Sequence, residues 1–309
     1  HYPIGDLKPE RTDSWEVGLD MKLFKDFNLG LSWYLANTFN QTFDPQISVS
    51  SGYTTIYLQT GYVRNTGLEL SLGYGHTWNN NFRWDSNFTL SHNKNKIKEL
   101  VRDYVHPETG ELINKDRLDV GGLGKARFIL KEGGTLGDLY TQSDLKRDDN
   151  GMVDIDPTGI VAIENNLPDI KLGSVFPKAN LAWSNHFSWK GISLSALFTA
   201  RIGGIVYSAT EAAMDQYGVS ERSALARDNG GVLVNNRTLV DAQNYYTTIG
   251  SESGLPQYYT YNATNVRLQE ASIGYLIPRK WLGNVCDIQV SVICLLYTSP
   301  SPRDGATSR

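Results

Sequence analysis

The apolar residues of this chain recur at every second position over unusually long stretches. In 15–23, Trp15, Val17, Leu19, Met21 and Leu23 alternate with polar residues or glycine. The same alternation returns in segments 27–35, 68–74, 82–90, 181–189, 192–198, 266–275 and 288–292. Period two over eight or more residues predicts β-strands with one apolar face. Several stretches reach about ten residues, the length that a tilted strand needs to cross a bilayer.

The expected connections between these strands alternate between short and long. The short ones are 25–26, 76–81, 188–191 and 278–284, and the long ones are 40–60, 95–177 and 203–263. Short turns on one side and long loops on the other are typical of an outer-membrane β-barrel, whereas a β-sandwich has shorter strands and no such alternation. Aromatic residues near the strand ends fit the interfacial girdles of such barrels, although aromatics also favour strands in general. They are Trp78, Trp84, Trp183, Trp189, Tyr275 and Trp281.

Composition excludes several classes of protein. The net charge of the 309 residues is −4, which gives no basic field for nucleic acid. A mean hydropathy of −0.35 usually indicates a soluble protein, but a transmembrane barrel alternates its two faces and never looks hydrophobic on average. The first residues show no signal-peptide pattern, and no apolar run is long enough for a transmembrane helix.

No motif in the sequence predicts catalysis, a cofactor or a metal. The acidic stretch 145–159 fails the calcium-loop pattern, because alignment on Gly151 puts Lys146 and Pro157 at ligand positions. A polar turn is the better interpretation. The five histidines are scattered, and the run 92–96 (HNKNK) is most simply a solvated rim at a strand end. We therefore expect no enzyme, with no catalytic, cofactor-binding or metal-binding residue.

The loop 203–263 is rich in tyrosine. A tyrosine ring offers a rigid apolar face with a polar tip, so these residues are candidates for contact with a substrate or a partner protein. The candidates are Tyr207, Tyr217, Tyr245, Tyr246, Tyr258 and Tyr259, with Tyr261 nearby. The alternative is a loop that packs its own aromatic rings together over the mouth of the barrel.

Six stretches resemble one family in the right order. They are LKPERTDSWEVGLDMKLFKDFNLGLSWYLANTFNQ (7–41), VRNTGLELSLGY (63–74), WDSNFTLSHNKNKIKEL (84–100), DNGMVDID (149–156), FPKANLAWSNHFSWKGISLSALFTARIGGIVYSAT (176–210) and NATNVRLQEASIGYLIPRKWL (262–282). Each is weak alone, but together they are similar to the barrel of SusC/RagA-like TonB-dependent outer-membrane transporters of Bacteroidetes, over about 1–292.

This resemblance implies an all-β fold: about ten strands of a 22-stranded transmembrane antiparallel barrel whose N-terminal plug would precede His1. It further implies import of oligosaccharides or other large nutrients, glycan or peptide, through the bacterial outer membrane. The implied partners are a SusD-like surface lipoprotein, the TonB complex through the absent N-terminal part, and outer-membrane lipid, with no nucleic acid. Since open sheet edges are not tolerated in lipid, we expect that this portion neither inserts nor transports alone.

Other functions stay open at this point. A TonB-dependent receptor for siderophores or cobalamin would differ in its gene neighbours. A passive porin or barrel adhesin would lack plug sequence upstream of His1. A soluble carbohydrate-binding β-sandwich would stay in solution as a full-length protein without detergent. The substrate depends on the loops, which are the least transferable part of a resemblance.

The end of the chain breaks the strand pattern. Codons that can encode Cys294 to Asp304 (CLLYTSPSPRD) resemble a transposase-end sequencing adapter read in frame; the alternative is a natural Pro-rich terminus. We therefore predict barrel over 1–293 and a non-native, disordered tail over 294–309. Cys286 is then the one native cysteine, and neither a metal site nor a disulfide framework is expected.

Overall fold

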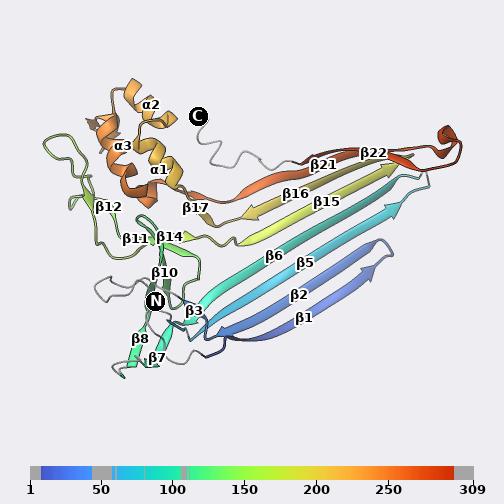
Figure 1. The fold of residues 1–309 in the computed structure, drawn as a ribbon, viewed down its shortest axis with the longest axis horizontal. Coiled ribbons are helices and arrows are strands. Elements are labelled where there is room, and N and C mark those ends of the chain that lie inside the picture. Colours follow the sequence, from blue (N-terminus) through green and yellow to red (C-terminus); the bar gives the residue numbers. More distant parts are fainter. Residues whose placement is uncertain are drawn as a thin grey trace.

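Eight long strands form one antiparallel sheet in the computed structural model, which describes residues 8–43, 58–59, 61–79, 81–105, 110 and 112–295. In sheet order they are β1 (Arg11–Leu23), β2 (Phe27–Phe39), β5 (Tyr62–Thr77), β6 (Arg83–Glu99), β15 (Ala179–Trp189), β16 (Ile192–Ile202), β21 (Asn265–Ile277) and β22 (Ile288–Leu295). Figure 1 shows them side by side, with tight turns at one end and long loops at the other. The predicted partial barrel is confirmed: the sheet is not closed, and β1 and β22 are its outer strands among the described residues.

The expected number of about ten barrel strands is too high for the described residues. The segment between β6 and β15 instead forms a separate four-stranded sheet of β14 (Ile170–Ser174), β11 (Asp138–Thr141), β10 (Ala126–Lys131) and β9 (Arg117–Leu123). Asp169 ties this sheet together, because its carboxylate accepts two hydrogen bonds from Arg117 at 2.6 and 2.8 Å and pairs with Lys131 at 2.9 Å. The hydrogen bonds and charge of these cations hold the pKa of Asp169 well below its usual range.

The register of the long strands separates apolar from polar residues into rows. One row across seven strands consists of Leu19, Leu31, Leu70, Leu90, Leu181, Ala200 and Val266. The two adjacent rows point to the opposite face and are mostly polar: Gly18, Ser32, Glu69, Ser91, Asn180, Arg201 and Asn265 on one side, and Asp20, Gly30, Ser71, Thr89, Ala182, Thr199 and Arg267 on the other. We call the two surfaces the apolar face and the polar face. A wall between lipid and a water-filled lumen requires this arrangement.

The N-x-G-x-E-L stretch of β5 shows why these residue types stand in this order. A Cβ on Gly67 would lie 2.2 Å from the ring of Tyr34, so glycine makes room for that ring on the polar face. Asn65 accepts a hydrogen bond of 2.9 Å from Asn95 on the neighbouring strand. Leu68 and Leu70 point to the other side and contribute to the apolar face.

The tight turns and the aromatic residues lie at the same end of the sheet. Lys190 and Gly191 both have positive φ, 46° and 88°, as a two-residue hairpin of type I′ requires. Ring pairs connect Phe27 to Tyr74 at 4.7 Å, Tyr74 to Trp84 at 5.2 Å, and Trp84 to Phe187 at 5.8 Å. The expected girdle members Trp78, Trp84, Trp189, Tyr275 and Trp281 are at or beside these turns. Trp183 differs, because it pairs with Phe88 and Phe198 further inside the sheet.

The two longest connections fold together into one lobe above the loop end of the sheet (Figure 1). The connection between β6 and β15 supplies β12 (Asp144–Leu145) and β13 (Ile163–Glu164), and the one between β16 and β21 supplies the rest: β17 (Ile205–Tyr207), α1 (Ala209–Gln216), α2 (Glu221–Asp228), β18 (Val232–Val234), β19 (Thr238–Val240), α3 (Ala242–Gly250), η2 (Ser251–Ser253), η3 (Pro256–Tyr258) and β20 (Thr260–Asn262). Leu145 and Val161 from the first connection share one buried cluster with Ile249, Leu255 and Tyr259 from the second. We call this unit the lobe.

Shorter elements complete the described chain. The pairs β3 (Thr42–Phe43) with β4 (Leu58–Gln59) and β7 (Val101–Val105) with β8 (Leu112–Lys115) extend the loop end, and η4 (Arg279–Leu282) joins β21 to β22. β22 continues through Cys294 and Leu295, and the rest of the predicted tail, 296–309, lies outside the described residues. Cys286 and Cys294 are free and exposed.

Candidate functional site

The polar face of the long sheet is hollowed. A cavity of about 780 Å³ extends across it from β1 to β21 and is lined by backbone and by polar side chains such as Glu16, Ser91 and Asn180. Glu16 accepts a hydrogen bond of 2.7 Å from Ser32 on the neighbouring strand, which fixes its carboxylate on this face. Hydroxyl, amide and carboxylate groups of this kind can exchange hydrogen bonds with a polar solute in place of water.

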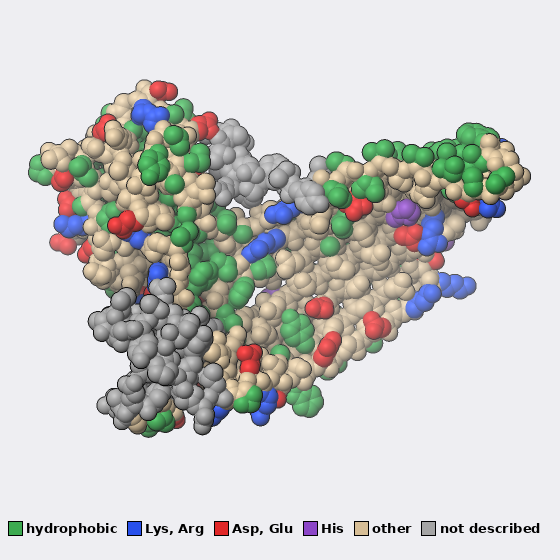
Figure 2. All heavy atoms as spheres, viewed as in Figure 1, with side chains coloured by type: hydrophobic (Ala, Val, Ile, Leu, Met, Phe, Trp, Pro, Cys, Tyr) green, Lys and Arg blue, Asp and Glu red, His purple; other side chains and the backbone are tan. Residues whose placement is uncertain are grey.

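The charged side chains that line this cavity are divided between the two sides of the sheet. The acidic groups Glu16 and Asp20 are on β1 and Glu69 is on β5, whereas Arg201 is on β16 and Arg267 on β21. Figure 2 looks onto this face and shows acidic side chains over the lower strands, basic ones over the upper strands near the loops, and charges of both signs towards the turn end. The two arginines line the cavity at the edge nearest the lobe.

A second hollow of about 700 Å³ opens where the sheet meets the loops. Arg201 and Arg267 line this hollow too, so it continues from the first. Its other walls are largely apolar and include Phe128, Val175 and Ile205. Arg201 donates a hydrogen bond through Nη2 to the carbonyl of Val175, and Arg267 makes no hydrogen bond or ion pair with the described part of the chain. The pair can therefore receive an acidic group while the apolar walls receive the rest of a solute.

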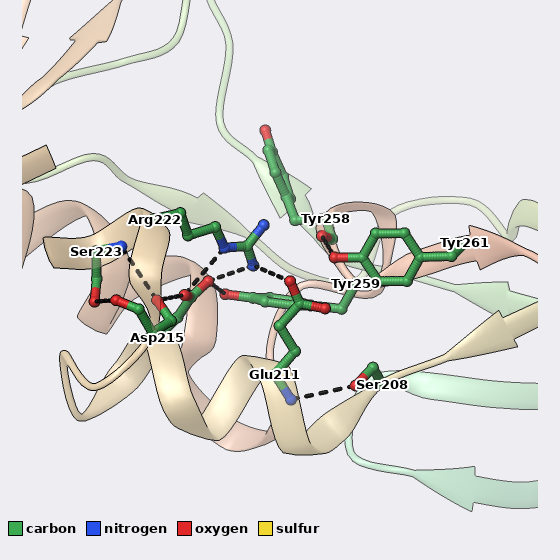
Figure 3. A network of polar contacts seen from close by, with 9 residues as sticks. Ser208, Glu211, Asp215, Arg222, Ser223, Tyr258, Tyr259 and Tyr261 are labelled. Atoms are coloured by element: carbon green, nitrogen blue, oxygen red, sulfur yellow. Dashed lines mark hydrogen bonds and ion pairs between the residues drawn. The ribbon is translucent and has the colours of Figure 1, made fainter. Parts of the chain in front are cut away.

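The lobe is organised around the buried carboxylate of Asp215 (Figure 3). Asp215 accepts hydrogen bonds from the hydroxyl of Tyr259 at 2.8 Å, from Nε of Arg222 at 3.0 Å and from the hydroxyl of Ser220. The Arg222 guanidinium also lies 4.9 Å above the ring centre of Tyr259, within cation–π range. These contacts connect α1, α2 and the segment that returns to the sheet.

The charges of this cluster support one another. Burial alone would lower the pKa of Arg222, but its hydrogen bonds with Asp215 and the charge of that carboxylate outweigh burial and raise the pKa. Burial and the charge of Asp215 raise the pKa of Tyr259 above its ordinary value. Arg222 therefore stays charged and Tyr259 stays neutral. Both groups serve to hold the lobe together, and neither is activated for catalysis.

The structure brings most of the predicted tyrosines together, but inside the lobe. Tyr259 is completely buried and belongs to the core, so its ring is not available to a ligand in this arrangement. Tyr207 donates its hydroxyl hydrogen bond to the carbonyl of Ser253. Tyr207, Tyr245, Tyr246 and Tyr258 are half-buried and pack against the core cluster. These placements favour the interpretation of a loop that packs its own rings.

Two of the predicted tyrosines also line open space. Tyr217 is 77% exposed. With Tyr246 it borders a pocket of about 300 Å³ on the outside of the lobe, whose rim includes Arg227 and Gln243. Contact with a substrate or a partner at Tyr217 and Tyr246 stays a prediction.

Sequence reasoning missed the two arginines of the polar face. Arg201 and Arg267 each occupy a polar-face position of an alternating strand, next to a residue of the apolar face. A search of the polar-face positions for charged residues would have found them. Their proximity could not be found that way, because the register of β16 against β21 shifts at a bulge between Leu197 and Phe198.

The acidic stretch 145–159 forms two successive turns. The carboxylate of Asp148 accepts from the backbone N–H groups of Asn150 and Met152, both at 2.9 Å. Asp156 does the same for Thr158 at 2.8 Å and Ile160 at 3.0 Å. Among the residues that the structure describes, no three His, Cys, Asp or Glu side chains are grouped to hold a metal.

The half-buried tyrosines predict how the lobe responds to alkali. Burial, with Tyr258 and Tyr246 nearby, raises the pKa of Tyr245 to about 12, and burial with a hydrogen bond to Glu211 raises that of Tyr261 to about 12. Because the unfolded value is about 10, stability from these groups is intact below about pH 10 and is lost as the pH rises towards 12. We expect Tyr245→Phe to remove part of the late phenolate absorbance in an ultraviolet titration. A late phase that is unchanged in this variant would contradict the assignment.

Comparison with known proteins gives consistent matches. The family model described as "TonB dependent receptor-like, beta-barrel" matches residues 1–161. Among curated proteins of Formosa agariphila, TonB-dependent receptor P3 is 25% identical over 303 residues, covering 90% of this chain and 28% of that protein, and TonB-dependent receptor P39 is 28% identical over 142 residues, covering 46% and 12%. The chain thus spans less than a third of either relative.

Solved structures show the same fold. A structure of the RagAB peptide transporter aligns with a TM-score of 0.64 at 19% identity, over 96% of this chain and 33% of that one. The RagAB peptide importer in its open-open state aligns with a TM-score of 0.62 at 17% identity, over 97% and 33%. No helix in the described residues is long and apolar enough to cross a membrane.

Proposed function

We propose, on the premise that this chain belongs to the TonB-dependent receptor-like β-barrel family and is SusC/RagA-like, that it is part of a transporter that imports large nutrients, oligosaccharides or peptides, through the bacterial outer membrane. The observation that carries the proposal is the match to the family over residues 1–161. The rows of the long sheet support it, because they supply one wall with a lipid-compatible face and a hydrated face.

The two hollows on the polar face are the proposed path of the substrate past this wall. Both are lined by Arg201 and Arg267, which would receive acidic or hydrogen-bonding groups of the nutrient at the loop end. We also propose that a SusD-like lipoprotein covers the lobe and that the TonB complex energises the full-length transporter. The exposed apolar side chains Met214, Tyr217 and Val219 on and after α1 offer a surface for such a lid.

Uptake by cells tests this function. A strain that lacks the full-length gene should lose uptake of fluorescent oligosaccharides or peptides, and the intact gene should restore it. Deletion of TonB or of the SusD-like gene should abolish restoration, and the lipoprotein should co-purify with the transporter. Restored uptake without TonB would indicate a passive porin, and restored uptake of only a ferric siderophore or cobalamin would indicate a receptor of that kind.

A further inference from the structure

Four basic side chains form a ladder on the apolar face at the loop end of β5 and β6. We call Arg64, His92, Lys94 and Lys96 the basic ladder. Asn93 and Asn95 between them point to the polar face, where both donate to Asn65, at 3.3 and 2.9 Å. Because alternate residues of a strand point to opposite faces, the lysines project from the same surface as Leu90 and Leu70. The basic residues of the run HNKNK, His92, Lys94 and Lys96, therefore belong to the outer wall of the sheet, beyond its apolar rows.

Two members of the ladder, Lys94 and Lys96, carry positive charge that no described residue neutralises, whereas His92 is hydrogen-bonded through Nδ1 to the carbonyl of Lys178. Lys94 is exposed, and neither Lys94 nor Lys96 makes an ion pair or hydrogen bond with the described residues. Arg64 donates through Nε to the neutral amide oxygen of Asn37 at 2.8 Å and keeps its charge. The nearest carboxylate in the same cross-strand row is Asp13, which is already paired with Arg11 at 2.9 Å.

The position of the ladder along β6 places it at membrane depth. Trp84, in the aromatic cluster beside the tight turns, precedes Lys94 by ten residues on the same strand and the same face. Ten residues at about 3.3 Å, tilted by about 45°, rise about 23 Å, close to the roughly 25 Å height of the apolar band on such a barrel. If Trp84 marks one boundary of the hydrocarbon layer, Lys94 and Lys96 are at the headgroups of the other leaflet.

We propose that the basic ladder binds the phosphate groups of outer-leaflet lipid headgroups. Ammonium and guanidinium groups are phosphate ligands, and long basic side chains extend from an apolar wall towards the headgroups. A solvated rim would need no fixed depth, and it would not need Lys94 and Lys96 on the apolar face without a carboxylate partner. This inference rests on the proposed location in the outer membrane.

Lipid retention by the full-length transporter tests the ladder. The protein is reconstituted into nanodiscs of phosphatidylcholine with a minor share of either lipid A or phosphatidylglycerol, and bound lipid is counted by native mass spectrometry. We expect the double variant Lys94→Gln, Lys96→Gln to weaken retention of both phosphate-rich lipids roughly 25-fold, at about fivefold per lysine. The charge-keeping variant Lys94→Arg, Lys96→Arg should retain them.

A matched control separates this site from bulk charge. Lys22→Gln, Lys25→Gln removes the same charge at the tight-turn end and should leave retention unchanged. Equal loss in both double variants would overturn the proposal, and so would unchanged lipid retention in a Lys94→Gln, Lys96→Gln variant that has lost binding of soluble polyphosphate. Heat-modifiable mobility of each variant reports insertion separately, so a protein that inserts without lipid preference contradicts only the ladder, whereas one that never inserts contradicts the proposed location.

Discussion

Replacing Asp215 by alanine is expected to unfold the lobe while leaving the long sheet intact. The change removes the carboxylate that Tyr259, Arg222 and Ser220 share and leaves the Arg222 charge without its main partner. Breaking a buried ion pair from one side costs about 3–5 kcal/mol, comparable with the stability of a small unit. Hydrogen–deuterium exchange of the full-length protein should show α1, α2 and α3 losing protection.

Asp228→Ala is the matched control for this result, because Asp228 is an exposed carboxylate on α2 in the same lobe. It should change exchange in the lobe little. If the lobe of the Asp215 variant keeps its protection from exchange, the Asp215 cluster contributes less to the stability of the lobe than its burial implies. If the long sheet loses protection as well, the lobe and the sheet unfold together, and the expectation that the sheet stays intact is wrong.

A charge placed on the apolar face should have the second large effect. Leu90→Arg puts a guanidinium in the middle of the row that runs from Leu19 to Val266, where lipid would surround it. At the bilayer midplane an arginine costs about 2–4 kcal/mol in barrels of this type. Urea unfolding of the full-length protein in lipid vesicles should show that loss in the free energy of unfolding.

The neighbouring residue supplies the control. Thr89→Arg changes the adjacent position on β6, but its side chain points to the polar face. Its effect should stay below about 1 kcal/mol, since the charge remains in water. Similar losses at positions 89 and 90 would contradict the assignment of the two faces, and a larger loss at position 89 would show that it is reversed.

The long strands were predictable because one physical rule acts along their whole length. Trp15, Val17 and Leu19 alternate with polar neighbours since a wall between two environments must repeat with period two. The four-stranded sheet between β6 and β15 has strands of four to seven residues, too short for that pattern to stand out. Its strands also pair across an irregular chain path, which local sequence does not encode.

The helices of the lobe had a local signal that periodicity alone overlooks. Ser208 and Glu211 follow the S-x-x-E capping pattern, and the Ser208 hydroxyl accepts from the Glu211 backbone N–H at 3.2 Å. Ser220 caps α2 and Asp241 caps α3 in the same manner. The role of Asp215 carried no such signal, because its partner Tyr259 is 44 positions away and only the folded chain brings them together.

The shared core of the lobe has a consequence for engineering and for sequence divergence. Leu145 and Val161 come from one long connection, and Val240, Ile249 and Tyr259 come from another. If only one connection is exchanged with that of a relative, its core residues would therefore pack against core residues that they do not match in the other connection. The smallest exchangeable cassette is the pair of connections together, so recombinants that keep both from the same parent should be the ones that reach the cell surface folded.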